Sequence, residues 1–529
     1  MASTTTPAIE IPTSSVYDYL FGSLDESDLG RIALIDGTSG AETTYGQLVG
    51  QVNALAGALA ARGVGVGDVV AVLCPNVPAF ATVFHGILRS GATATTINSL
   101  YTADEIVAQL TDASATWLFT VSPLLPHAAA AADRLGFAAD HLIVLDGADG
   151  HPSLRDLLSE GEPAPDVQFD PAEHIAVLPY SSGTTGRPKG VMLTHRNLVS
   201  NVAQCREAIG LGADDRVLAV LPFFHIYGMT VLLNYALAGR SALVTMPRFD
   251  LTEFLRIISE YRTSWLFIAP PIAVALAKHP LVDEYDLSSV EVVFSGAAPL
   301  DGALSNAVAA RLDCVVTQGY GMTEASPVTH TVPVDRADID RKSIGIPLPN
   351  TECRLMDPES GAVIPTPESG LSLPGEIQIR GPQVMKGYLG NDEATASTLD
   401  TDGWLHTGDI ATVDADGVYT IVDRLKELIK YKGYQVAPAV LEAVLLTHPK
   451  IADAAVIGAL DEDGQEIPKA FVVLQAGQSL DDTDVIAYVA ERVAPHEKVR
   501  RVAFIDAIPK STSGKILRKD LRAAEKASV

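Results

Sequence analysis

Short apolar runs alternate with longer alanine-rich stretches between about residue 30 and residue 420. The runs at residues 69–73, 117–121 and 264–269 are rich in β-branched and aromatic residues, as buried strands are. The alanine-rich stretches between them predict helices. A strand–helix rhythm of this kind is typical of βα units, so we predict an α/β fold with a large N-terminal domain built from βα subdomains.

The pattern changes between residues 402 and 419. Two Asp-Gly pairs, Asp402-Gly403 and Asp416-Gly417, flank short apolar runs. Such pairs favour the tight turns of antiparallel hairpins. The large domain is therefore predicted to close with a small antiparallel, β-barrel-like part.

A charge-dense segment at residues 424–427 precedes a pattern that mixes helices and strands. Pro438 can open a helix that runs to His448, and a second helix is predicted at residues 482–493. Strands are predicted at residues 451–460, 469–474 and 501–508. We therefore predict an N-terminal domain of residues 1–423, a hinge at residues 424–426 and a small α+β C-terminal domain of residues 427–529.

Bulk properties agree with a folded protein of more than one domain. The chain has 529 residues, of which 47% are hydrophobic, and a single core rarely serves so long a chain. A formal net charge of −27 opposes binding to nucleic acid. The most apolar window, residues 69–88, is interrupted by prolines and polar residues, so no transmembrane segment is predicted. The N-terminus lacks the basic start and apolar core of a secretory signal, so a cytoplasmic location is expected.

A glycine-rich loop at residues 181–190 carries two hydroxyl pairs, three glycines and a lysine between two apolar runs. Backbone N–H groups, hydroxyls and a lysine charge together suit phosphate binding. The loop is not a Walker A loop, because Lys189 is followed by Gly190 and by an apolar run that predicts a strand. A surface hairpin is the alternative. A lone Gly-Thr-Thr-Gly would favour that hairpin, whereas the full ten-residue string at residues 181–190 favours phosphate binding.

This string resembles the signature of the adenylate-forming ligases, which include acyl-CoA synthetases, 4-coumarate:CoA ligases, firefly luciferase and peptide-synthetase adenylation domains. Three further segments resemble motifs of this family in the same order along the chain: an adenine and magnesium segment at residues 318–324, a ribose segment at 403–409 and a catalytic-lysine loop at 509–515. The resemblance implies that ATP activates a small-molecule carboxylic acid as an acyl-adenylate. It implies ATP, Mg²⁺ and CoA as co-substrates, with no tightly bound cofactor.

The resemblance also assigns roles within the nucleotide site. Tyr320 is expected to stack on adenine, Asp409 to accept the ribose hydroxyls with help from Arg424, and Glu324 to bind Mg²⁺. The alternatives are a packed turn for Tyr320, an ordinary turn aspartate for Asp409 and a helix-capping role for Glu324. The remaining expected contacts to ATP or AMP are Ser181, Ser182, Gly183, Thr184, Thr185, Lys189, Gln318, Gly319, Thr323 and Lys426.

Lys515 is expected to be the catalytic lysine of the first half-reaction. Attack of a carboxylate on the α-phosphate brings two anions together, and an ammonium between them stabilises the charge that grows in the transition state. From local sequence alone, a surface lysine in a Ser/Gly loop is the alternative. Because this lysine lies in the small domain, the assignment requires that domain to close over the glycine-rich loop.

Residues after the hinge resemble the 4-coumarate:CoA ligases most. Lys426 lies at the hinge about which the small, mobile domain rotates in the family. Lys430 and Gln435 resemble catalytic residues of the thioester-forming step, and Lys432 and Gly433 resemble CoA contacts. Arg248 is expected either to contact the CoA nucleotide or to form a structural salt bridge.

The segment at residues 221–228 also resembles the 4-coumarate:CoA ligases. It places His225 near the reacting carboxylate as a catalytic residue and Tyr227 within reach of a para-hydroxyl; packed aromatic roles are the alternatives. The same matching predicts an acyl pocket lined by Phe294, Ala297, Gly319, Val328 and Thr329. Val231 is apolar where plant enzymes can carry a serine, which makes the pocket wall suitable for cinnamate, other aryl acids or medium-chain fatty acids.

The leading hypothesis is therefore an acid:CoA ligase for 4-coumarate- or cinnamate-type aryl acids. A medium- or long-chain fatty acyl-CoA synthetase is the main alternative. Loading of a carrier protein, a luciferase-like oxygenation and a non-catalytic nucleotide binder are further alternatives. The sequence contains no indication of the oligomeric state.

Overall fold

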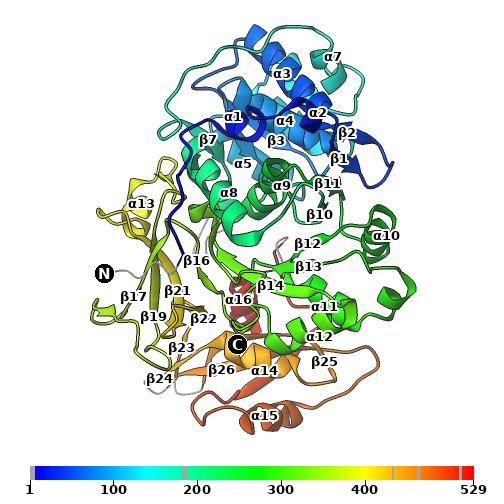
Figure 1. Cartoon of the computed structure of the whole chain (residues 1–529). Helices are drawn as coiled ribbons and strands as arrows, with labels where there is room; N and C mark the ends of the chain where they lie inside the picture. Colours follow the sequence, from blue (N-terminus) through cyan, green and yellow to red (C-terminus); the bar gives the residue numbers. More distant parts are fainter. Residues whose placement is uncertain (1–5, 182–187, 432–433, 462–464, 512–514, 529) are drawn as a thin grey trace.

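The computed structural model describes residues 6–181, 188–431, 434–461, 465–511 and 515–528 (Figure 1). Ser182, Gly183, Thr184, Thr185, Lys432 and Gly433 lie outside these ranges, and the side chain of Gln435 is likewise not described. Predictions made for those positions stay predictions. The α/β class is confirmed, with sheets and helices in the larger part and a smaller C-terminal part.

One sheet carries the strand predicted at residues 69–73. Its order is β20(Gly387–Tyr388), β9(Lys189–Thr194), β7(Ile175–Leu178), β4(Thr93–Thr96), β3(Val69–Leu73), β5(Trp117–Thr120) and β6(Leu142–Val144), and β8(Tyr180–Ser181) pairs with β9. Pairing is parallel from β7 to β6 and antiparallel at β9. The helices α3(Tyr45–Ala61), α4(Pro78–Arg89), α5(Ala103–Asp112) and α6(Leu125–Leu135) belong to this region. The glycine-rich loop therefore joins two antiparallel strands, β8 and β9.

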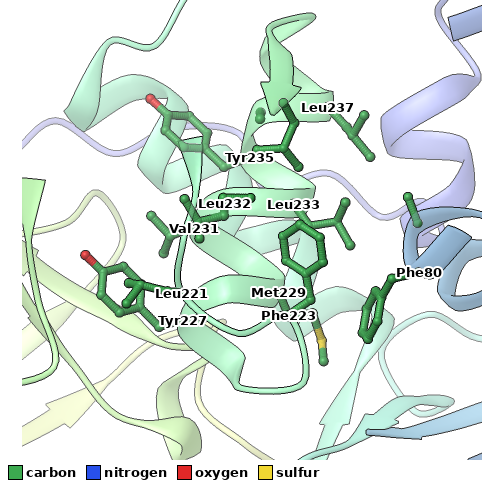
Figure 2. Close-up of a cluster of buried hydrophobic side chains, with 14 of the residues drawn as sticks. Phe80, Leu221, Phe223, Tyr227, Met229, Val231, Leu232, Leu233, Tyr235 and Leu237 are labelled. Carbon is green, nitrogen blue, oxygen red and sulfur yellow. The ribbon is translucent and has the colours of Figure 1, made fainter. Parts of the chain in front are cut away.

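A second sheet follows the order β16(Ile346–Pro347), β15(Val328–Thr331), β14(Val315–Gly321), β13(Val292–Ser295), β12(Trp265–Ile268), β10(Arg216–Ala219), β11(Ala242–Thr245), β1(Ile32–Asp36) and β2(Glu42–Thr44). Its central pairs are parallel, and its helices are α8(His195–Ile209), α9(Tyr235–Gly239), α10(Leu251–Tyr261), α11(Pro270–Lys278) and α12(Gly302–Leu312). Between β10 and α9 lies η3(Tyr227–Asn234), a π-helix. Figure 2 shows side chains of η3, including Met229 and Leu233, close to Phe80 and Phe223 in the main core. Wider turns of this type occur often at functional sites.

The antiparallel part predicted from the Asp-Gly pairs is present. Its order is β18(Val363–Ile364), β17(Glu352–Met356), β19(Gly375–Arg380), β21(Leu405–Val413) and β22(Tyr419–Arg424), with every pair antiparallel. The pair Asp416-Gly417 forms the turn between β21 and β22, where Asp414 Oδ1 accepts hydrogen bonds from the backbone of Asp416 and Val418. The short helix α13(Asp392–Thr398) precedes β21.

The C-terminal part, orange and red at the bottom of Figure 1, begins with the hairpin β23(Ile429–Tyr431) and β24(Tyr434–Val436). It continues with α14(Pro438–Leu446), β25(Ile451–Leu460), β26(Glu466–Leu474), α15(Asp482–Ala490), β27(Arg501–Phe504) and α16(Arg518–Ser528). The strand predicted at residues 451–460 matches β25. The strand predicted at residues 501–508 is too long, because β27 pairs with β26 only from Arg501 to Phe504.

The C-terminal part has a hydrophobic cluster of its own, in which Ile429, Leu441, Val456 and Val499 are buried. The last buried residue of the main hydrophobic cluster, in sequence order, is Leu405. A hinge at residues 424–426 agrees with these clusters but stays a prediction. In the described part of the chain, no helix has both the length and the apolar character needed to cross a bilayer. The window at residues 69–88 instead forms β3 and the buried helix α4.

Candidate active site

A cavity of about 1270 Å³ joins segments that are far apart in the sequence. It lies where the ends of β8, β14 and β22 meet the C-terminal segment around residue 515. Many of the residues singled out from sequence line it: Ser181, Lys189, His225, Tyr227, Phe294, Ala297, Gly319, Tyr320, Thr323, Glu324, Val328, Arg424, Lys426 and Lys515. The fold therefore brings three of the four recognised motifs and both predicted domains to one site, together with the two described ends of the glycine-rich loop.

Asp409 lies directly behind the cavity wall. It is 4% exposed and faces Arg424 across the pair of strands β21 and β22. Arg424 Nε lies 3.1 Å from Asp409 Oδ1, and the Tyr320 hydroxyl donates to Asp409 Oδ2 at 2.5 Å. A carboxylate has about four lone-pair positions, so both oxygens can still accept a ribose hydroxyl.

Tyr320 is half-buried at the end of β14. Burial and the charge of Asp409 raise the pKa of Tyr320 well above its usual value, so the phenol stays protonated and acts as a donor. A Cβ at Gly321 would lie 2.1 Å from the carbonyl oxygen of Pro327, so only glycine allows this close approach of the backbone. The ring of Tyr320 is thus held at the cavity by its hydroxyl and by its flanking backbone.

Gln318 was expected beside the adenine, and its side chain is bonded to neighbouring segments of the fold. It is buried, its Oε1 accepts from the Leu300 backbone at 3.2 Å, and its Nε2 donates to the Arg341 carbonyl at 2.6 Å. It is not among the residues that line the cavity. Its side chain anchors β14 to neighbouring segments, and a contact to adenine stays a prediction.

Glu324 is 7% exposed in the short turn η5(Thr323–Ala325). Its Oε1 accepts a hydrogen bond from the Tyr388 hydroxyl at 2.8 Å. Among the described residues, no group of three or more His, Cys, Asp or Glu side chains could hold a metal ion. A metal at Glu324 would therefore need ligands from the substrate, and Mg²⁺ is the ion that commonly combines one or two carboxylates with phosphate oxygens. The donor set fits Mg²⁺ bound together with ATP.

Lys515 extends from the C-terminal segment to the same cavity. Burial and the nearby charge of Arg424 lower the pKa of Lys515 to about 8, although Asp409 and Glu324 act in the opposite direction. Two hydrogen bonds hold the backbone: Lys515 N–H donates to Ser511 Oγ at 3.1 Å, and Ser511 N–H donates to the Lys515 carbonyl at 2.8 Å. Lys510 pairs with Asp453 at 2.6 Å. These contacts hold Lys510, Ser511 and Lys515, the described residues on either side of positions 512–514.

His225 is half-buried at the cavity. Burial, with a smaller contribution from Lys515, lowers the pKa of His225 to about 4, so the imidazole is neutral near pH 7. Its Nδ1 accepts a hydrogen bond from the Tyr227 backbone at 3.3 Å, which leaves the proton on Nε2. The ring can therefore offer one N–H donor to a neighbouring oxygen.

The predicted acyl pocket is formed by tightly packed rings and glycines. A Cβ at Gly296 would lie 2.7 Å from the ring of Tyr227, and a Cβ at Gly319 would lie 2.6 Å from Phe294. The Tyr227 hydroxyl lies 3.5 Å from the Phe294 carbonyl oxygen, at the outer limit for a hydrogen bond. Val231 is buried in the core, near Tyr227 in Figure 2, and it does not line the cavity. Missing side chains at Gly296 and Gly319 thus make room for two aromatic rings at the wall.

Comparison with known proteins places this site in a family. The family model for AMP-binding enzymes matches residues 25–389, and the model for the AMP-binding enzyme C-terminal domain matches residues 440–515. This chain belongs to the AMP-binding enzyme family. The resemblance seen in the four motifs is thereby confirmed.

Relatives of this AMP-binding enzyme match it over its full length. The 4-coumarate--CoA ligase 5 of Oryza sativa subsp. japonica is 42% identical, over 98% of this chain and 96% of its own. The structure of the anthranilate CoA ligase AuaEII in complex with anthranoyl-AMP has a TM-score of 0.89 at 27% identity, over 98% of this chain and 99% of that one. ATP-bound MatB from Rhodopseudomonas palustris has a TM-score of 0.87 at 29% identity, over 97% and 99%.

Some expected site residues of this AMP-binding enzyme lie away from the cavity. Lys430 is exposed on β23, where it pairs with Gln435, and its backbone N–H donates to Glu466 at 2.7 Å. Arg248 is exposed beyond β11. Thr329 is fully buried, and its hydroxyl donates to the Tyr320 carbonyl at 3.3 Å. None of these described side chains lines the cavity, and the roles expected of Lys430, Arg248 and Thr329 stay predictions.

Sequence reasoning missed several residues of this AMP-binding enzyme that line the cavity. They include Asn98, Tyr101, Tyr388, Lys510 and Lys519. Tyr388 contacts both Lys189 and Glu324. Its sequence neighbourhood, Lys386-Gly387-Tyr388-Leu389-Gly390, reads as an ordinary turn. No local signal distinguishes it, because its partners are separated from it by 64 residues or more.

Proposed function

We propose that this protein, an AMP-forming acid:CoA ligase like the 4-coumarate:CoA ligases that match it over their full length, acts on aryl acids of the 4-coumarate or cinnamate type. The observation that carries the proposal is the common cavity of Lys515, Glu324 and Tyr320, with aromatic side chains at its wall. ATP and CoA are the co-substrates, and Mg²⁺ is proposed to bind with ATP. A cytoplasmic location belongs to the same proposal.

In the first half-reaction, Asp409 and Arg424 orient the ribose and Tyr320 covers the adenine. A carboxylate oxygen of the acid attacks the α-phosphorus of ATP, and pyrophosphate leaves as the acyl-adenylate forms. Lys515 stabilises the two approaching anions, and His225 can donate its Nε2 proton in a hydrogen bond to a substrate oxygen. Lys189, with the hydroxyls and backbone of the glycine-rich loop, neutralises the β- and γ-phosphates. When bound, Mg²⁺ held by Glu324 and the phosphates would further neutralise the departing pyrophosphate.

In the second half-reaction, the CoA thiolate attacks the acyl carbonyl carbon and AMP leaves, so that a thioester replaces the mixed anhydride. Lys515 lines the cavity while Lys430 is exposed away from it. We therefore propose rotation about residues 424–426, including Lys426, which exchanges the Lys515 loop for the hairpin that carries Lys430 and Gln435. Lys432, Gly433 and Arg248 are proposed CoA contacts in that orientation.

Lys430→Ala is expected to separate the two half-reactions. Acid-dependent exchange of pyrophosphate into ATP should stay near the wild-type rate, because Lys430 is outside the cavity in the orientation that the structure describes. Thioester formation from preformed acyl-adenylate and CoA should slow by about tenfold, the effect of one lost charge contact. The control is Lys498→Ala, because this lysine lies in the same part of the chain but outside both the cavity and the hairpin of Lys430. Equal slowing of both steps would contradict the rotation.

The pH dependence of adenylation follows from Lys515. Its ammonium is the useful form, and with a pKa of about 8 it is lost as the pH rises through that value. The kcat/KM for ATP, which reports the free enzyme, should be level below pH 8 and fall about tenfold per pH unit well above it. Lys515→Arg retains the charge at any accessible pH, so its residual activity should not fall there. A wild-type profile that is level to pH 10 would exclude Lys515 as the titrating group.

The proposed acid class rests on the wall near Tyr227. Tyr227 and Phe294 are buried beside glycines, and the Tyr227 hydroxyl has only a long contact within the described residues. It is therefore available to a para-hydroxyl of the acid. The deciding experiment is CoA-dependent AMP release with cinnamate, 4-coumarate, benzoate, a medium-chain and a long-chain fatty acid. We expect the aryl acids to give the highest kcat/KM. A fatty acid preferred by about tenfold would overturn the acid class, and absence of CoA-dependent AMP release would overturn the function.

A further inference from the structure

The segment around β20(Gly387–Tyr388) connects the two elements on the phosphate side of the cavity. Its backbone pairs with β9, the strand that leaves the glycine-rich loop, with Tyr388 opposite Val191. Leu389 N–H donates to the Gly190 carbonyl at 2.8 Å. At its other end, Met385 N–H donates to the Glu324 carbonyl, also at 2.8 Å. One short segment thus fixes the distance between Lys189 and Glu324.

The side chain of Tyr388 joins the same two residues. Its hydroxyl donates to Glu324 Oε1 at 2.8 Å, and the Lys189 ammonium lies 4.0 Å from the centre of its ring. Tyr388 is 4% exposed and lines the cavity. A cation over an aromatic face and a charge-assisted hydrogen bond are both strengthened when water is excluded.

We infer that Tyr388 is a positioning residue for the metal–phosphate side of the site: its hydroxyl orients the Glu324 carboxylate, and its ring orients the Lys189 ammonium toward ATP. The hydrogen bond to Oε1 restrains rotation of the carboxylate, and no other hydrogen bond to this carboxylate is found within the described residues, so Oε2 stays available to a metal ion. The phenolic hydroxyl is the donor in this hydrogen bond, because a carboxylate oxygen can only accept. This inference rests on the proposed binding of ATP with Mg²⁺.

Two substitutions separate the two contacts. Tyr388→Phe removes the hydroxyl and keeps the ring, whereas Tyr388→Leu removes both. The readout is the dissociation constant of ATP, measured by calorimetry on the full chain with Mg²⁺ and again with EDTA. The ratio of these two constants reports how much the metal strengthens ATP binding, independently of turnover.

Tyr388→Phe is expected to leave ATP binding in EDTA unchanged and to reduce the metal-dependent strengthening by about tenfold, as expected for a lost hydrogen bond to a charged group. Tyr388→Leu should show the same reduction and should also weaken ATP binding in EDTA by about threefold, because Lys189 loses the ring. Tyr45→Phe is the matched control: its buried hydroxyl donates to the Ser241 carbonyl at 3.0 Å, away from the cavity, and its loss should change neither constant.

Each outcome decides the inference. A normal ratio in Tyr388→Phe, beside a lost ratio in Glu324→Gln, would overturn the role of Tyr388 and leave the ligase function intact. A normal ratio in Glu324→Gln would overturn the metal assignment and this inference together, whereas CoA-dependent AMP release tests the proposed function separately. Should Tyr388→Leu not fold, as judged by its thermal unfolding, Tyr388→Met takes its place, because methionine keeps an apolar side chain beside Lys189 but has no aromatic face. The same threefold weakening of ATP binding in EDTA is expected, and unchanged binding would overturn the role of the ring.

Discussion

Replacing Lys515 with alanine is expected to slow adenylation by about 10²- to 10³-fold, the usual effect of removing one preorganised electrostatic stabiliser. The ammonium lies in a cavity shared with Glu324, Tyr320 and Arg424, and it is partly shielded from water. Its charge therefore acts on the reacting anions more strongly than it would in bulk water. The measurement is acid-dependent exchange of labelled pyrophosphate into ATP.

The Lys515→Ala variant should retain most of the thioester-forming step from preformed acyl-adenylate, because that step is assigned to the opposite face of the C-terminal part. Lys498→Ala should behave as wild type in both assays, since Lys498 neither lines the cavity nor belongs to the hairpin that carries Lys430. Near-normal pyrophosphate exchange in Lys515→Ala would remove this lysine from the mechanism.

Replacing Asp409 with asparagine is expected to raise the KM for ATP by about a hundredfold. The change removes a charged acceptor for the ribose hydroxyls, and hydrogen bonds to charged groups contribute roughly 1.5–3 kcal/mol each. It also leaves Arg424 without the carboxylate that now lies 3.1 Å from its Nε. Initial rates of AMP release at varied ATP, with acid and CoA saturating, measure the effect.

Stability must be separated from binding in this variant. A buried charge that loses its partner is destabilising, so thermal unfolding of Asp409→Asn is expected to shift downward even without ATP. Asp416→Asn, at the exposed turn of the same pair of strands, is the matched control and should alter neither ATP KM nor unfolding temperature. A change of less than about threefold in ATP KM, beside normal stability, would contradict the ribose contact.

Local sequence was sufficient to predict the positions of strands that are made almost entirely of apolar residues. β3 and β25 lie at the residues predicted from their apolar runs, since such runs can be buried on both faces of a sheet. The ends of elements were less predictable. The helix α15 ends at Ala490 and not at Val493. The strand β27 ends where its pairing with β26 ends, and the residues of one strand do not indicate how far its partner strand pairs with it.

The acyl wall and the metal–phosphate side could not be derived from sequence in the same way. Gln318 was expected at the site from its motif and Thr329 from the resemblance to the 4-coumarate:CoA ligases, and both side chains bond to backbone groups inside the fold. Tyr388 was not expected there, yet it joins Glu324 to Lys189. The direction of a side chain depends on the strand register and on neighbouring segments. The spacing of residues in a motif gives no information about either.

Short motifs were enough to identify the family and its chemistry, because recognition of phosphate, ribose and carboxylate groups requires particular residue types, as in the glycine-rich loop and the segment that ends at Lys515. Which of those residues lie together became clear only from the folded structure. Lys515 reaches Glu324 and Arg424 only through packing of the C-terminal part, and Lys430 faces away for the same reason. Contacts between groups separated by hundreds of residues depend on how sheets and helices pack, and that packing is a property of the whole chain.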